Sequence, residues 1–156
     1  MCVWRLFEYV TLPHKDLGNT RHVMGDHAPC ELETAMRAQD LQRGDIVIVP
    51  HPEIAGFELI KRVIGLPGET IGLSNGYVHI NEIALAEPWA NGPTRPDGEW
   101  TLGLDEVFVL GDSRQVSAAD SRTIGPIDAS TVRWRAVARY WPLQSAGRLP
   151  TRPFSP

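Results

Sequence analysis

The sequence predicts a mainly β domain, with short antiparallel strands, long loops and little helix. Short apolar runs recur between residues 45 and 140 and end at glycine or proline, which is typical of strands. The 14 glycines and 13 prolines suit a loop-rich β protein. The chain has 156 residues, of which 42% are hydrophobic, so it is long enough for one domain with its own core.

Five segments carry the strand pattern: residues 45–49, 57–64, 70–80, 107–110 and 132–140. The first, second and fourth are nearly continuous apolar runs, which indicates buried strands. The third is predicted to be a hairpin around Asn75-Gly76, because both residue types readily take the positive φ of a tight turn. The last alternates bulky apolar and polar residues, as a half-buried strand does.

The remaining segments are expected to be something other than strands. Residues 31–42 have a helix-forming composition and predict one short helix. Residues 86–103 hold three prolines and are expected to be a long loop. The sequence therefore predicts an atypical N-terminal segment over residues 1–42, a β core over residues 43–143, and a disordered tail over residues 144–156.

Composition excludes several classes of function. The net charge is −4, and no basic excess indicates a nucleic-acid partner. No window approaches the ~18 apolar residues of a membrane span, so we expect a soluble cytoplasmic protein or one peripheral to a membrane. Cys2 and Cys30 are too far apart for a Cys-x-x-Cys site. We therefore expect no metal or cofactor, and we favour two free thiols while a single disulfide stays open.

Lys61 is the first candidate for chemistry. In strict alternation it shares a face of its strand with Leu59 and Val63. Burial disfavours the charged ammonium, so the pKa of Lys61 is expected to fall, and a lysine with a lowered pKa can act as a general base. The alternative is an ordinary strand lysine that reaches water or pairs with a carboxylate.

A polar loop after the strand at residues 107–110 is the second candidate. Ser117 could orient a neighbouring amine by a hydrogen bond, and Asp120 and Arg122 could pair and brace the loop. The alternative is a polar turn with helix-capping residues.

Together these segments resemble the type I signal peptidases, a bacterial family of serine-type endopeptidases that use a Ser/Lys dyad. The resemblance covers residues 43–142 and rests on three motifs: Gly-Asp-Ile-Val at 44–47, Ile-Lys-Arg-Val-Ile-Gly-Leu-Pro-Gly-Glu at 60–69, and Phe-Val-Leu-Gly-Asp-Ser-Arg at 108–114 with Ser117 and Asp-Ser-Arg at 120–122. Family members usually have Asn where Ser113 stands, and the chain has one extra residue between Ser117 and Asp120.

The resemblance implies the signal-peptidase β-fold and an enzyme that removes N-terminal signal or leader peptides. Lys61 would be the general base, Ser117 would orient it, and Asp120 with Arg122 would be the bracing pair. The substrate would be a polypeptide with small residues before the cleavage site. No cofactor is implied. Family members are usually membrane-associated.

The nucleophile of the family has no counterpart in this sequence. The family places its serine before the lysine in a Ser-Met-x-Pro motif, and here no serine precedes Ser74. Ala35 stands at the serine in one register, and Val10 does so in another, which we prefer on spacing. Other candidate nucleophiles have hydroxyl or thiol groups: Thr11, Thr20, Thr34 and Cys30.

Four interpretations follow. The chain is an endopeptidase with an unusual nucleophile, an inactive relative that binds peptides as a scaffold, or a soluble maturation protease similar to those of nickel superoxide dismutase. The fourth is that residues 1–40 arise from a misplaced start or a shifted reading frame.

Overall fold

Strands are the main regular structure in the part of the chain that the structure describes. The computed structural model describes residues 20–23, 30–34, 40–55, 57–117, 119–139 and 147–148. Its helical pieces are α1 (Ser121–Ile124) and the 3-10 turn η2 (Ala129–Thr131). Its strands are β1 (Thr20–Val23), β2 (Cys30–Thr34), β3 (Ile46–Pro50), β4 (Glu58–Gly65), β5 (Thr70–Ser74), β6 (Tyr77–Ile80), β7 (Ile83–Ala84), β8 (Gly98–Thr101), β9 (Glu106–Leu110), β10 (Ile127–Asp128), β11 (Trp134–Arg139) and β12 (Gly147–Arg148).

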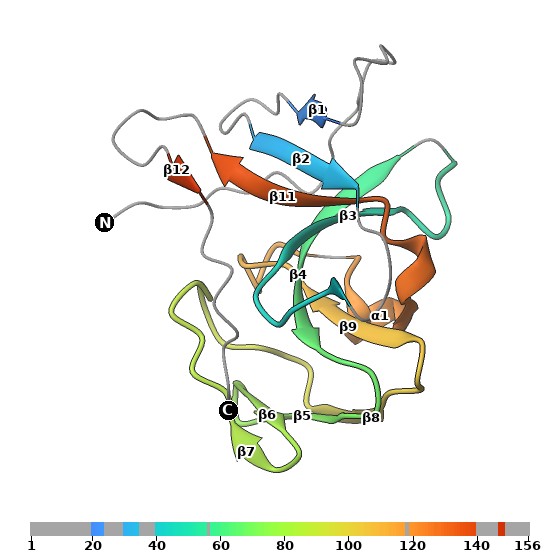
Figure 1. Ribbon diagram of the computed structural model, residues 1–156. Coiled ribbons are helices and arrows are strands. Elements are labelled where there is room, and N and C mark those ends of the chain that lie inside the picture. The colour runs from blue at the N-terminus through green and yellow to red at the C-terminus, as the bar shows by residue number, and fades with distance from the viewer. Residues whose placement is uncertain are drawn as a thin grey trace.

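The strands form two antiparallel sheets. The larger has the order β1-β2-β11-β3-β4-β9-β10, with β12 paired to β11, and the smaller has the order β7-β6-β5-β8. In Figure 1 the smaller sheet lies below the larger one, where β4 leads into β5 and β8 leads into β9. The predicted mainly β fold with little helix is thus confirmed.

The larger sheet is buried on both faces around β4 and β9. One core cluster contains Val63 and Val109, and a second contains Ile64 and Leu110, the next residue along each strand. The second cluster also holds the apolar side chains of β5 and β6, so it joins the two sheets. Burial on both faces explains why these strands have nearly continuous apolar runs instead of alternation.

The five strand segments expected from the sequence are confirmed, as β3, β4, the β5–β6 hairpin, β9 and β11. Ser74 and Tyr77 pair at the end of the hairpin. Asn75 and Gly76 between them have φ values of 54° and 88°. These positive values are the ones that a two-residue hairpin turn requires.

Three expectations for the other segments are wrong in part. The predicted helix at residues 31–42 begins as β2, which pairs with β1 on one side and β11 on the other, while residues 35–39 lie outside the described residues. The predicted loop at residues 86–103 ends in β8, which pairs with β5. In the expected disordered tail, Gly147 and Arg148 form β12 beside β11. For β2 and β8, hydrogen bonds to strands distant in the sequence, β11 and β5, outweigh the local composition, whereas β12 pairs with its neighbour in the chain, β11.

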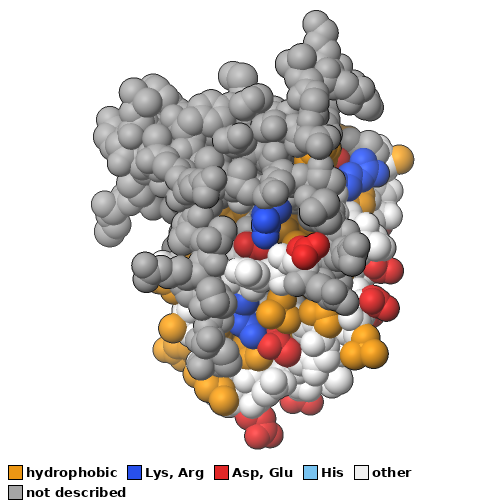
Figure 2. Space-filling view, viewed as in Figure 1, with side chains coloured by type: hydrophobic (Ala, Val, Ile, Leu, Met, Phe, Trp, Pro, Cys, Tyr) orange, Lys and Arg blue, Asp and Glu red, His pale blue; other side chains and the backbone are white. Residues whose placement is uncertain are grey.

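No helix among the described residues is both long and apolar enough to cross a membrane. On the face drawn in Figure 2, acidic and basic side chains of the described residues lie among one another rather than in separate patches.

Candidate active site

Strand β4 carries Lys61 into the core. Leu59 and Val63, two positions before and after it, are fully buried, and Val47 pairs with it on β3. Lys61 itself is only 2% exposed. The prediction that Lys61 shares a face of β4 with Leu59 and Val63 is therefore confirmed. Apolar side chains surround the stem of the lysine. An ammonium group buried in this way needs a polar partner.

Ser117 supplies that partner from the loop after β9. Lys61 Nζ donates a hydrogen bond to Ser117 Oγ at 2.9 Å. The loop holds the backbone of Ser117 on both sides. Its N–H donates to the carbonyl of Ser113 at 3.0 Å, and its carbonyl accepts from Arg122 Nη2 at 2.9 Å. The serine is half-buried, so the pair lies at the edge of the core.

Gly111 makes this approach possible. A Cβ at residue 111 would overlap the Ser117 hydroxyl and would lie 3.8 Å from Lys61 Nζ. The absence of a side chain therefore lets the loop close over the end of β9 and bring the serine to the lysine.

Asp120 and Arg122 form a buried ion pair behind Ser117. The guanidinium donates to both carboxylate oxygens, at 2.8 and 2.7 Å, and Asp120 also caps α1 by accepting from the Arg122 N–H. Burial by itself would raise the pKa of Asp120. The hydrogen bond and charge of Arg122, with smaller contributions from the Gly111 N–H and the Ser117 hydroxyl, outweigh burial and hold the pKa below its ordinary value of 3.8.

The four predicted site residues thus lie in one hydrogen-bonded row: Lys61, Ser117, Asp120 and Arg122. The Ser117 hydroxyl accepts from the lysine and donates to the ionised carboxylate. Its O–H proton is then directed to Asp120 instead of to Lys61, which suits a group that orients Lys61 better than one that attacks a carbonyl. An unprotonated Lys61 held in this way has the geometry of a general base for a hydroxyl brought beside it.

Two further buried ion pairs support the site, and neither was predicted from the sequence. Arg62, next to the lysine, donates to both oxygens of Asp112 at 2.7 and 2.6 Å and lies 4.8 Å from the ring centre of Trp89. Arg114 forms the second pair with Glu87. The signal available in the sequence was the presence of arginines inside or directly after apolar strands, where a charge needs a partner.

The sheet register indicates how far three candidate nucleophiles lie from Lys61: Thr20, Thr34 and Cys30. Only their backbones are described. Thr20 pairs with Glu33, Glu33 with Arg135, Arg135 with Val47, and Val47 with Lys61. Four strand spacings of about 4.8 Å separate Thr20 from Lys61, roughly 19 Å along the sheet.

Thr34 and Cys30 are also remote from the lysine. They lie on β2, three strands from β4, and the row of Thr34 reaches Ile60 instead of Lys61. Cys30 lies further along β2, opposite Arg139. Val10, Thr11 and Ala35 lie outside the described residues.

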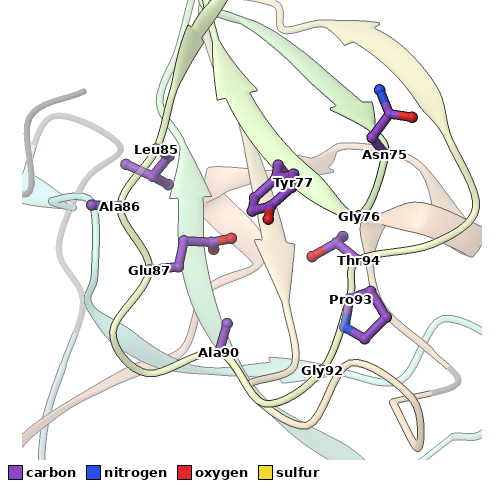
Figure 3. Close-up of a pocket in the computed structure, with 10 residues that line it drawn as sticks. All are labelled: Asn75, Gly76, Tyr77, Leu85, Ala86, Glu87, Ala90, Gly92, Pro93 and Thr94. Carbon is purple, nitrogen blue, oxygen red and sulfur yellow. The ribbon is translucent and has the colours of Figure 1, made fainter.

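A groove of about 460 Å³ opens at a different place, between the β5–β6 turn and the loop that follows β7 (Figure 3). Tyr77, Glu87 and Thr94 are among its lining residues, and Lys61 and Ser117 are not. Among the described residues, no group of three or more His, Cys, Asp or Glu side chains is arranged to hold a metal ion.

The chain is similar to known proteins in sequence and in fold. The family model for signal peptidase, peptidase S26, matches residues 6–141. The chain is 38% identical to a signal peptidase I of Leptolyngbya laminosa over 119 residues, which are 69% of the chain and 57% of that protein. It is 30% identical over 136 residues to subunit 1b of a mitochondrial ATP-independent inner membrane protease of Arabidopsis thaliana, which covers 86% of the chain and 70% of that protein.

A solved structure is similar as well. The signal peptidase I of Enterococcus faecalis V583 superposes with a TM-score of 0.53 and 31% identity, over 60% of this chain and 93% of that one. The chain spans only 57% and 54% of the length of two cyanobacterial signal peptidases that it matches.

Proposed function

The chain belongs to the signal peptidase family, peptidase S26, and we propose that it is a signal-peptidase-like endopeptidase in which Lys61 is the general base. The substrate would be a polypeptide with small residues before the cleavage site, as the family resemblance implies. One observation supports this role above the others. Lys61 is 2% exposed among apolar neighbours, and its amine is held by Ser117 at 2.9 Å.

The remaining roles follow from the contacts of this amine. Ser117 orients Lys61, and the ion pair of Asp120 with Arg122 braces the loop that carries Ser117. Lys61 would remove the proton from an attacking hydroxyl and later return it to the leaving amine. The chain thus keeps the lysine of a Ser/Lys dyad together with the groups that hold it.

The test is cleavage of a precursor polypeptide that carries an N-terminal signal peptide, with the new N-terminus identified by sequencing. Lys61→Ala should abolish cleavage at that site. Arg133→Ala is the matched control, because Arg133 is a mostly exposed cation outside the site, and it should cleave like the parent chain. Equal cleavage by the parent chain and Lys61→Ala would rule out Lys61 as the base.

A second candidate function is a catalytically inactive relative that binds peptides. The absence of any serine before Ser74 favours it, together with the distance of Thr20 and Thr34 from Lys61 in the sheet register. An inactive chain that lost only its nucleophile should regain Lys61-dependent cleavage when a serine is restored. Val10→Ser tests the preferred register, and Ala35→Ser tests the other. Recovery in one variant alone would identify the register.

A further inference from the structure

We propose that Glu87 is a positioning residue for Lys61, acting through Arg114 on the loop that carries Ser117. This inference rests on the proposed role of Lys61 as the general base. Glu87 lies outside the three sequence motifs, in the proline-containing segment after β7. It precedes Arg114 by 27 positions.

The first step is the contact between the two charges. Arg114 donates to both carboxylate oxygens of Glu87, at 2.5 and 3.0 Å. The arginine side chain is 0% exposed and the glutamate side chain 9%. Arg114 Nη1 also donates to Thr94 Oγ1. A guanidinium buried this deeply depends on its countercharge, because an unpaired charge in the core is strongly destabilising.

The second step leads from Arg114 to the lysine. The third donor group, Arg114 Nε, donates to the carbonyl of Gly111 at 3.0 Å. The Ser117 hydroxyl packs against Gly111. The N–H of Gly111 donates to Asp120 Oδ2 at 3.2 Å. One arginine therefore connects Glu87 to the glycine that sets the distance between Ser117 and Lys61.

The backbone reinforces the same connection. The Asn91 N–H donates to the carbonyl of Asp112 at 2.8 Å, and the Arg114 N–H donates to the carbonyl of Asn91 at 3.1 Å. These bonds join the segment around Glu87 and Thr94 to the Ser117 loop as a short parallel bridge. In Figure 3, Glu87 and Thr94 lie on opposite walls of the groove with their side chains directed toward the space between them.

The mechanism follows from charge. With Glu87 neutral, the buried Arg114 gains free energy by turning toward water, and its bond to Gly111 is lost. Gly111 and Ser117 are then free to shift away from Lys61. The charge of Glu87 is thus expected to affect the environment of an amine that it does not touch.

The chain offers a direct readout, because Lys15 and Lys61 are its only lysines. Brief acetylation with acetic anhydride, followed by mass spectrometry of the two lysine peptides, gives the labelling of Lys61 relative to Lys15 in the same sample. In Glu87→Gln we expect this ratio to rise about tenfold, as local opening of the site exposes the amine. Asp97→Asn removes the charge that pairs with Arg95 at the surface, keeps an oxygen that can accept from the Asn75 N–H, and should leave the ratio unchanged.

A double variant separates positioning from simple charge burial. Glu87→Gln with Arg114→Gln removes both charges, so it should fold even if Glu87→Gln alone does not, and circular dichroism checks this. We expect the ratio to stay raised in the double variant, because the bond to Gly111 is still missing. A parental ratio in the double variant, or in a folded Glu87→Gln, would overturn the proposal. Labelling needs no cleavage, so this result is independent of whether the chain proves to be an active protease.

Discussion

Lys61 and Ser117 are 56 positions apart in the sequence, and the lysine Nζ lies 2.9 Å from the serine Oγ. The contact joins a buried strand in the middle of the larger sheet to a loop at the end of the neighbouring strand β9. It gives the buried amine a hydrogen-bond acceptor and a fixed direction.

Removing the Ser117 hydroxyl should leave Lys61 in place but unoriented. We expect Ser117→Ala to lower kcat/KM for a cleavable precursor by about 100-fold, the loss that a displacement of about 1 Å can cause. KM should change little, because the Ser117 hydroxyl contacts the general base Lys61 and not the substrate. Steady-state kinetics measures both constants in the parent or, if needed, in the serine-restored chain. Ser113→Ala is the matched control in the same loop, and an equal loss there would point to general damage to the loop.

Lys61 should serve the function of the protein without adding to the stability of its fold. We expect Lys61→Met, which is one atom shorter and replaces the polar amine with an apolar end, to leave the free energy of unfolding unchanged or raise it by about 1–4 kcal/mol. Leu59→Ala, on the same face of β4, should instead lose about 2–5 kcal/mol because it opens a cavity. Urea denaturation compares the two. A large loss in Lys61→Met would mean that the amine stabilises the fold.

The sequence was most informative where local pattern and tertiary burial agree. β3, β4 and β9 are buried on at least one face along their length, so their apolar runs indicate them directly. β2 and β8 were missed because each is stabilised by pairing with strands distant in the sequence. In β2 the residues Glu31 and Glu33 have helix propensity, but the strand is held between β1 and β11.

The site could be predicted to a similar degree. Lys61, Ser117, Asp120 and Arg122 were named from strand alternation and from family motifs, and the structure places them within hydrogen-bond reach of one another. Glu87 carried no such signal. Its partner lies far along the chain, and its own segment has the composition of a loop, so only the folded arrangement reveals the contact.

Gly111 should be essential for the approach of Ser117 to the lysine. We expect Gly111→Ala to displace Ser117, because the new methyl group would overlap its Cβ and hydroxyl. Lys61 should then be acetylated faster, and cleavage should fall at least as far as in Ser117→Ala. Gly72→Ala is the control, since a Cβ there meets nothing closer than His79 Cβ at 3.7 Å. A Gly111→Ala protein with parental labelling of Lys61 would show that the loop can adjust without moving the serine.

The pair of Asp120 and Arg122 should make stability depend on pH. The folded state holds the pKa of Asp120 below its ordinary value of 3.8, so the pair stabilises the protein above that pH, and this stabilisation is lost as the pH falls through the lowered pKa. Arg122→Gln should therefore cost about 3 kcal/mol near neutral pH, since the Asp120 charge is left buried.

The difference in unfolding free energy between Arg122→Gln and the parent should shrink as the pH falls, first where Asp120 of the variant takes up a proton and finally where Asp120 of the parent does so at its lowered pKa, because protonated Asp120 no longer needs the guanidinium. Urea denaturation from about pH 7 to about pH 3 measures it. Asp128, whose pKa is also lowered, titrates in both proteins and cancels in the difference. Arg95→Gln, at an exposed pair, should give a small difference at every pH. A difference for Arg122→Gln that stays constant with pH would mean that Arg122 acts through its bonds to the carbonyls of Ser117 and Arg95 instead.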